Sequence, residues 1–156
     1  MSAVQKPIEF IDLKAQRQRI GTAMDEAILR VVNHGGYIMG PEVTQLEKEL
    51  AAMGGAKHAI SCANGTDAIV MVLMAKNVGP GDAVLVPSFT FAATAEAVAL
   101  CNATPIFVDV EAESFNMCPK SLEQGLAVAK AKGLKPCGVI SVDLFGQPAD
   151  YDRIEA

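Results

Sequence analysis

The chain has 156 residues, of which 51% are hydrophobic and 20% are charged, and its formal net charge at pH 7 is -5. This length can bury a core, and the acidic balance, without a stripe of Lys and Arg between aromatics, excludes the electrostatic footprint of a nucleic-acid-binding protein. The longest apolar run, Ala68 to Ala75, falls short of the roughly 20 residues of a membrane-spanning helix.

Signals for export and for metal binding are absent from the sequence. The N-terminal stretch has no apolar region with a small-residue cleavage site, and Asp12 interrupts its only hydrophobic patch, so we expect a cytoplasmic protein. The two histidines, His34 and His58, have no companion at metal-ligand spacing, and we expect no metal site. The four cysteines stand singly, which favours small buried residues with free thiols: Cys62, Cys101, Cys118 and Cys137.

The first part of the chain predicts helices. From Leu13 to Val32, apolar side chains recur at steps of three and four, which is typical of one amphipathic helix, and His34-Gly35-Gly36 ends it. Pro41 at a first helical position and Glu42 in the first turn predict a second helix, which continues to Gly54-Gly55. Because these helices, within residues 1–56, precede the sheet, we expect them to form an arm or a packing surface and not a crossover.

From Lys57 onward, short apolar runs alternate with helical windows. Strands are predicted over residues 58–63, 83–87, 105–110 and 137–145, and helices over residues 66–79, 91–103 and 121–133. A capping box of Ser121 and Gln124 opens the last of these helices. The strand runs are apolar almost throughout, as in a mostly parallel sheet with helices on both faces. The sequence therefore predicts α/β architecture with right-handed crossovers.

The last residues, 146–156, predict a loop followed by the opening of another helix, with Asp150 or Asp152 as its cap. The printed sequence stops about one helical turn later. Because a domain rarely ends there, we expect the chain to be a fragment of a larger domain.

The stretch CANGTDA, residues 62–68, joins a predicted strand to a predicted helix and allows two interpretations. Free amides at the helix start could hold a phosphate, because Gly65 permits close backbone approach and Thr66 adds a hydroxyl donor. Alternatively the stretch is only a helix cap, with Asn64 as the cap and Asp67 reaching back to it. The carboxylate of Asp67 favours the cap slightly, since it repels an anion unless it points away. The residues alone leave both interpretations open.

Two further strand ends carry candidate residues. Phe89 and Phe91 follow the run 83–87 and lie where ligands of open α/β sheets collect, so either could offer a flat face to a planar ligand; the alternative is that both belong to the core. Asp143 lies at the end of the predicted strand 137–145 and could be a functional carboxylate or a hydrogen-bond acceptor within its loop. We favour the acceptor.

Taken in order, several blocks of the sequence resemble the N-terminal part of the DegT-type (DegT/DnrJ/StrS) sugar aminotransferases, which are pyridoxal-phosphate enzymes of fold type I. The blocks are FIDLKAQ, GYIMGPEV, CANGTDA, GPGDAVLVPSFTFAATAEAV, ATPIFVDV and LFGQPADYD, and they run from Phe10 to about Ile154. Their order and spacing make the resemblance specific. CANGTDA and FTFAATAE look most like enzymes that aminate the 3-keto group of a UDP-linked N-acetylated uronic acid sugar.

The resemblance implies that residues 57–156 form an incomplete α/β large domain that binds pyridoxal 5'-phosphate. Gly65 and Thr66, beside Asn64, would hold the cofactor phosphate. Phe91 would stack on the pyridine ring. Tyr37, in the block GYIMGP, would be a substrate-side contact near the dimer boundary.

The sequence departs from the family pattern at two of these blocks. Asn64 stands where many members have Ser, which leaves its side-chain contact to the cofactor open. Asp143 replaces a His that is common in the family, so no role of that His can be transferred to this chain.

The resemblance also implies an activity for the complete protein: a homodimeric enzyme of amino-sugar or polysaccharide biosynthesis that moves an amino group from glutamate to a nucleotide-linked keto sugar. Such enzymes place the Schiff-base lysine and the aspartate that pairs with the pyridinium nitrogen beyond position 156, and no lysine here sits in a matching motif. We therefore expect no transamination by this chain alone. Two alternatives stay open: a non-catalytic module that binds phosphate or a partner, and another fold type I enzyme, such as a cysteine desulfurase or an aldolase.

Overall fold

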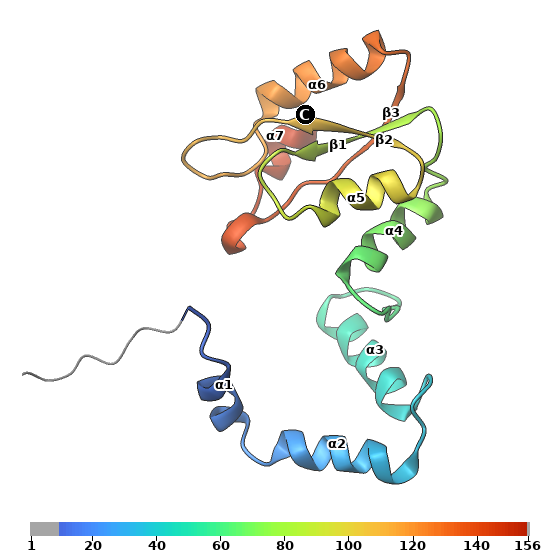
Figure 1. The fold of residues 1–156 in the computed structure, drawn as a ribbon, viewed down its shortest axis with the longest axis vertical. Coiled ribbons are helices and arrows are strands. Elements are labelled where there is room, and N and C mark those ends of the chain that lie inside the picture. Colours follow the sequence, from blue (N-terminus) through green and yellow to red (C-terminus); the bar gives the residue numbers. More distant parts are fainter. Residues whose placement is uncertain (1–9, 156) are drawn as a thin grey trace, which may run out of the picture. The chain divides into compact units, whose positions relative to one another are not determined.

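The computed structural model describes residues 10–155, which form two compact units. The first, which we call the helical unit, ends at Ser61, and the second, the sheet unit, begins at Cys62 (Figure 1). The helical unit contains α1 (Leu13–Ile20), α2 (Ala23–His34) and α3 (Pro41–Met53). The sheet unit contains, in order, α4 (Gly65–Ala75), β1 (Asp82–Pro87), α5 (Ala93–Leu100), β2 (Thr104–Val108), α6 (Pro119–Ala131), β3 (Lys135–Val139), the 3-10 turn η1 (Leu144–Gly146) and α7 (Tyr151–Glu155).

The prediction of one helix from Leu13 to Val32 is wrong, because Gly21 divides it into α1 and α2. Gly21 has φ 65° and ψ -142°, a positive-φ conformation that glycine adopts at little cost. The guanidinium of Arg17 binds both the Gly21 carbonyl and the Asp25 carboxylate, which stabilises the break. At the other end of α2, Gly35 is a left-handed C-cap, so the predicted end of this helix is confirmed.

The apolar stripe of the helical unit is exposed. None of the residues described for α1, α2 and α3 is buried. Ile28, Leu29 and Val32 of α2 each leave more than half of their surface exposed. The role of these helices as an arm or packing surface therefore stays a prediction.

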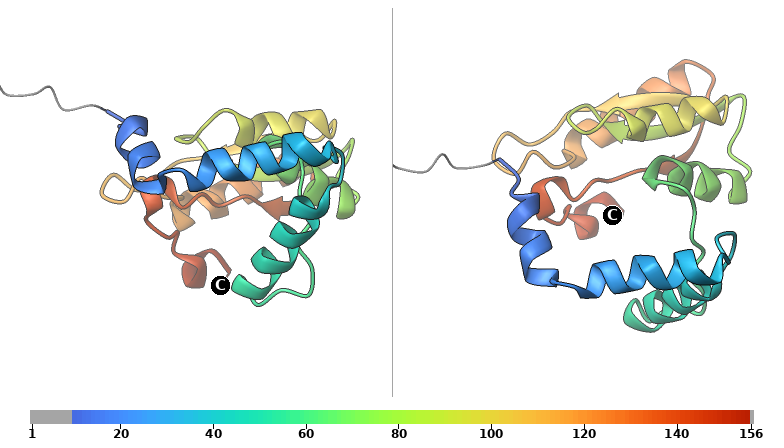
Figure 2. Two further views of the ribbon diagram at one scale, coloured as in Figure 1. Left: turned by 90° about the horizontal axis from the view of Figure 1, so that it is seen from below. Right: turned by 60° about the horizontal axis from the view of Figure 1, so that its bottom comes forward.

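The sheet unit has a three-stranded parallel sheet in the order β2-β1-β3. Successive side chains of the central strand β1 point to opposite faces. Leu85 packs under α6, whereas Val84 and Val86 pack under α4 and α5, so helices cover both faces (Figure 2). Because β2 and β3 lie on opposite sides of β1, right-handed crossovers require α5 and α6 to lie on opposite faces, as they do.

Helix α6 approaches the sheet closely at Gly125. A Cβ at this position would lie 2.9 Å from Leu85 Cδ2 and 3.3 Å from Val108 Cγ2. Both side chains are fully buried in the core beneath α6. The absence of a side chain at Gly125 therefore sets the distance between helix and sheet.

Several local predictions are wrong. Residues 58–63 form an exposed loop, since none of the strands within residues 10–155 pairs with them and an extended segment without a partner loses its ladder hydrogen bonds. The last strand ends at Val139 instead of continuing to 145, and α6 begins at Pro119, before the predicted capping box. The Ser121 hydroxyl accepts the N–H of Asp109 (2.9 Å) and does not cap the helix.

Two further sequence predictions concern the cysteines and the lengths of the helices. All four cysteines are free, as predicted, but the prediction that they are buried is wrong: Cys62 and Cys137 are exposed, and Cys101 and Cys118 are only partly buried. No helix within the described part of the chain is both long enough and apolar enough to cross a membrane.

Candidate functional site

The N-terminus of α4 carries the candidate phosphate site. Asn64 is the N-cap, and its side-chain oxygen accepts the N–H of Asp67 (2.9 Å), while its carbonyl accepts the N–H of Ala68 (3.2 Å). Within residues 10–155, no acceptor receives the N–H of Gly65 or of Thr66. Two backbone donors at the positive end of the helix dipole are therefore available to an anion.

Gly65 leaves room directly beside these donors. No heavy atom other than its chain neighbours and the backbone of its own helix lies within 4 Å of an ideal Cβ at Gly65, and its φ is not in the left-handed region. Neither packing within the chain nor backbone conformation therefore requires glycine there. Close approach of a ligand to the backbone would require it.

Asp67 belongs to the cap. Its carboxylate accepts the side-chain N–H of Asn64 (3.0 Å), so the two side chains exchange hydrogen bonds. The prediction that Asp67 reaches back is correct in direction, but it binds the amide side chain of Asn64 and not its backbone N–H. The cap leaves the N–H groups of Gly65 and Thr66 free, so capping and anion binding are compatible at this helix end.

Phe91 lies in the loop between β1 and α5. Its side chain is 79% exposed, and Phe89 is half-exposed, so the interpretation of both as core residues is wrong. The Phe91 carbonyl accepts the N–H of Thr94 (3.1 Å), which starts the first turn of α5 and sets the backbone at Phe91. An exposed ring held on a hydrogen-bonded backbone can present its face to a planar ligand.

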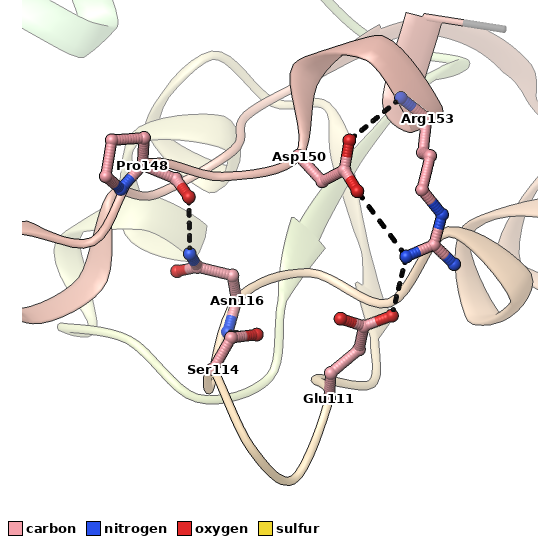
Figure 3. A network of polar contacts seen from close by, with 6 residues as sticks. All are labelled: Glu111, Ser114, Asn116, Pro148, Asp150 and Arg153. Atoms are coloured by element: carbon pink, nitrogen blue, oxygen red, sulfur yellow. Dashed lines mark hydrogen bonds and ion pairs between the residues drawn. The ribbon is translucent and has the colours of Figure 1, made fainter.

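A buried amide joins the loops that follow β2 and β3. Asn116 is only 5% exposed; its Nδ2 donates to the carbonyls of Gln147 (2.9 Å) and Pro148 (3.0 Å), and its Oδ1 accepts the N–H of Leu144 (3.2 Å). Figure 3 shows Asn116 directed at Pro148, with Arg153 between Glu111 and Asp150 as a second, exposed link between the same segments. The two loops are therefore held together at the carboxyl edge of the sheet.

Asp143 closes the second of these loops. Its Oδ1 accepts the N–H of Ala149 (2.9 Å) and the hydroxyl of Tyr151 (2.9 Å), as expected of a loop acceptor. These two donors, the Ala149 N–H first, lower the pKa of the Asp143 carboxyl below its ordinary value. At neutral pH Asp143 is an ionised structural acceptor.

Sequence reasoning missed an aromatic cluster at the same edge. The ring centroids of Phe89 and Phe115 lie 5.6 Å apart, and those of Phe115 and Phe145 lie 6.3 Å apart in an edge-to-face arrangement. Phe115 and Phe145 have φ values of 60° and 56°, in the left-handed region that phenylalanine rarely adopts. No sequence signal indicates such a conformation, since it depends on contacts between loops distant in sequence.

The remaining predicted site residue, Tyr37, belongs to the helical unit. It lies in the loop between α2 and α3 and is 64% exposed. In the same unit, Glu47 of α3 accepts both the N–H (2.9 Å) and the hydroxyl (2.8 Å) of Ser61. These bonds lower the pKa of the Glu47 carboxyl and tether the segment that leads into Asn64.

Residues 18–156 match the DegT/DnrJ/EryC1/StrS aminotransferase family. The chain belongs to this family. The resemblance found in the sequence blocks is therefore confirmed, and the α/β fold class is confirmed by solved relatives.

Individual relatives support the assignment. The UDP-2-acetamido-2-deoxy-3-oxo-D-glucuronate aminotransferase of Pseudomonas aeruginosa PAO1 is 51% identical over 96% of this chain and 40% of that protein. A DegT DnrJ EryC1 StrS aminotransferase from Brucella abortus has a TM-score of 0.90 and 53% identity, covering 96% of this chain and 40% of its own. NtdA from Bacillus subtilis with bound cofactor PMP has a TM-score of 0.74 and 29% identity, covering 83% and 28%. The chain thus spans about 40% of the length of the curated relative.

The residues of this DegT-family chain fit the phosphate and ring of the cofactor that the family implies. The N–H groups of Gly65 and Thr66, with the Thr66 hydroxyl, form a donor set suited to a phosphate, and the space beside Gly65 is open. Phe91 offers an exposed aromatic face in the same unit.

Proposed function

We propose that this chain forms the cofactor-binding part of a pyridoxal-phosphate-dependent nucleotide-sugar aminotransferase. The observation that carries the proposal is the free donor pair at Gly65 and Thr66 in a chain of the DegT family. When bound, the cofactor supplies an electron sink for amino transfer. The residues of this chain would bind and orient it: Gly65 and Thr66 by donating to the phosphate, with Asn64 shaping the cap, and Phe91 by stacking on the ring.

For the complete protein, we propose a UDP-linked 3-keto uronic acid sugar as amino acceptor and glutamate as donor. The 51% identity to the Pseudomonas aeruginosa enzyme supports this substrate class. We further propose a cytoplasmic homodimer in which Tyr37 contacts the substrate. The family reaction also needs a lysine and a carboxylate, which lie beyond position 156 in such enzymes, so the 156-residue chain would bind the cofactor without turnover.

The proposal can be tested with pyridoxamine 5'-phosphate, which, unlike the aldehyde, does not condense with surface lysines. We would titrate it into the ¹⁵N-labelled chain and follow the amide signals of Gly65 and Thr66 by NMR, with unphosphorylated pyridoxamine as the matched ligand. We expect the two signals to shift with the phosphorylated compound only, and the Phe91 ring signals to shift as well.

Variants of the candidate phosphate site at α4 provide a second test. Thr66→Val removes the hydroxyl and keeps the shape of the side chain, so binding should weaken by about 10- to 150-fold, the loss of one hydrogen bond to a charged group. Thr44→Val makes the same change on an exposed helical position of the other unit and should leave binding unchanged. Equal shifts with both ligands, or none at Gly65 and Thr66, would contradict phosphate binding at α4.

A further inference from the structure

The loop between α2 and α3, residues 35–40, is folded tightly. A Cβ on Gly40 would lie 2.1 Å from the carbonyl oxygen of Gly36, so the two backbones touch. Met39 has φ 50°, a left-handed conformation that is unfavourable for a side chain of this kind. Such a loop needs specific contacts to hold it.

His34 supplies contacts to this loop with both of its ring nitrogens. Nδ1 accepts the N–H of Gly36 (3.0 Å), and Nε2 lies 3.1 Å from Oε1 of Glu42. Because a backbone N–H can only donate, Nδ1 carries no proton in this arrangement, and the proton on Nε2 is donated to the carboxylate. The hydrogen bond from His34 is also the main cause of a lowered pKa at Glu42, which is therefore an ionised acceptor at neutral pH.

Tyr37 directly follows the residue that His34 binds. Its N–H donates to the carbonyl of Gly35 (3.0 Å), and its hydroxyl lies 3.5 Å from the carbonyl of Val32. The ring is largely exposed. The bond from Gly36 to His34 thus fixes the backbone immediately before Tyr37 and ties it to the first turn of α3.

We propose that His34 is a positioning residue for the substrate side of the site: it joins Gly36 to Glu42 and thereby sets the position of Tyr37. The inference rests on the proposed function in one respect, the contact between Tyr37 and substrate. In the sequence, His34 has no companion at metal-ligand spacing and stands at a predicted helix end, and it is the last residue of α2. Because Nδ1 accepts from Gly36 and Nε2 donates to Glu42, the ring is also held in one tautomer, with its proton on Nε2.

Protonation of the imidazole would break only one of the two contacts. A proton on Nδ1 would face the Gly36 N–H, donor against donor, so this bond would be lost while the contact to Glu42 remained. Glu42 on α3 contacts the ring, and Arg30 and Glu26 on α2 line the same surface depression as His34; the Nε of Arg30 lies 3.9 Å from Oε1 of Glu42. Glu42 and Glu26 attract the added positive charge, and Arg30 opposes it.

Two substitutions separate the contacts. His34→Asn places an acceptor at the position of Nδ1 but cannot reach Glu42, whereas His34→Gln places a donor at the position of Nε2 and loses the acceptor for Gly36. We would record amide hydrogen exchange and ¹H-¹⁵N spectra of the whole 156-residue chain at pH 8. Exchange at Gly36 should become about 5- to 10-fold faster in His34→Gln, as expected for the loss of one hydrogen bond, and stay near the wild-type rate in His34→Asn. The ring signals of Tyr37 should change in His34→Gln; the chain has only two tyrosines, which simplifies their assignment.

A pH titration of the wild-type chain provides a readout that does not depend on any variant folding. The Gly36 amide signal should move when the His34 ring takes up a proton at low pH, and it should not do so in His34→Asn. His58→Asn, at the other histidine, is the matched control and should leave the titration of Gly36 intact. A Gly36 signal independent of pH, or unchanged exchange in His34→Gln, would overturn the inference.

These measurements need no ligand, so they are independent of the test of cofactor binding. If the Gly36 amide does not show the expected exchange and pH response while pyridoxamine phosphate still binds at Gly65, only the role of His34 is overturned. Failure of phosphate binding with the expected behaviour at Gly36 would overturn the proposed function and leave His34 as the residue that orders the Tyr37 loop.

Discussion

Replacement of Asn116 should destabilise the sheet unit by more than the loss of one hydrogen bond. Asn116→Ala removes three hydrogen bonds, two to the carbonyls of Gln147 and Pro148 and one from the N–H of Leu144. At about 0.5–1.5 kcal/mol each, the bonds are together worth about 1.5–4.5 kcal/mol. Because Gln147 and Pro148 are exposed and their carbonyls can regain water, we expect a loss of about 2–3 kcal/mol in the free energy of unfolding.

The substitution Asn116→Asp tests the direction of these bonds. It keeps the acceptor for the Leu144 N–H but directs a second carboxylate oxygen at two carbonyl oxygens. At pH 7 the loss should be at least as large as for Asn116→Ala. The introduced carboxyl would have a raised pKa in the folded state, so the deficit should shrink as the pH falls and the protonated group can donate.

The free energy can be measured by native-state hydrogen exchange at amides of β1, which report on the sheet unit separately from the helical unit. Gln147→Ala is the matched control, since it removes an exposed amide side chain from the same loop and leaves the carbonyl of residue 147 in place. A loss below about 0.5 kcal/mol in Asn116→Ala, or one equal to that of Gln147→Ala, would refute the reasoning that this amide joins the loops.

Two further predictions concern the sheet unit. Gly125→Ala should lower the free energy of unfolding of the sheet unit by about 1 kcal/mol or more, because the added methyl group would press on a buried leucine of β1. Helix propensity alone predicts that alanine stabilises the helix. A variant that is more stable in urea unfolding would therefore exclude the close contact. Tyr151→Phe should raise the pKa of Asp143, although the Ala149 N–H keeps it below the ordinary value. A carboxyl whose pKa is lowered by folding stabilises the protein above its unfolded-state pKa, and this stability is lost as the pH falls through the folded-state pKa. The variant should therefore lose less stability on acidification than the wild type. An unchanged Asp143 titration by NMR would contradict this.

Local signals in the sequence predicted those features that depend on neighbouring residues. Gly35 ends α2 and Pro41 starts α3 because left-handed caps and first-turn prolines act within a few residues. Asn64 caps α4 for the same reason, and Asp150 starts α7 by accepting the N–H of Arg153. The alternation of apolar runs and helical windows likewise indicated parallel strands covered on both faces.

Features that depend on distant partners could not be predicted in this way. Residues 58–63 have a strand-like composition, yet composition cannot supply a neighbouring strand, and they form a loop. The left-handed Phe115 and Phe145 have no local cause that the sequence reveals. His34 offered two ring nitrogens, but only the folded turn shows that Gly36 and Glu42 lie on opposite sides of the ring.

The sequence by itself determined the class of the fold, the family and the position of the donor pair at Gly65 and Thr66, because a capped helix start is specified by adjacent residues. Only the tertiary structure decided that β1 is the central strand and that Asn116 joins two loops. Its partners lie 28 to 32 residues away, and contacts over such separations arise from the packing of the whole sheet unit. The physical reason is the range of the interactions: caps and turns act within one helical turn, whereas burial brings together groups that the sequence keeps apart.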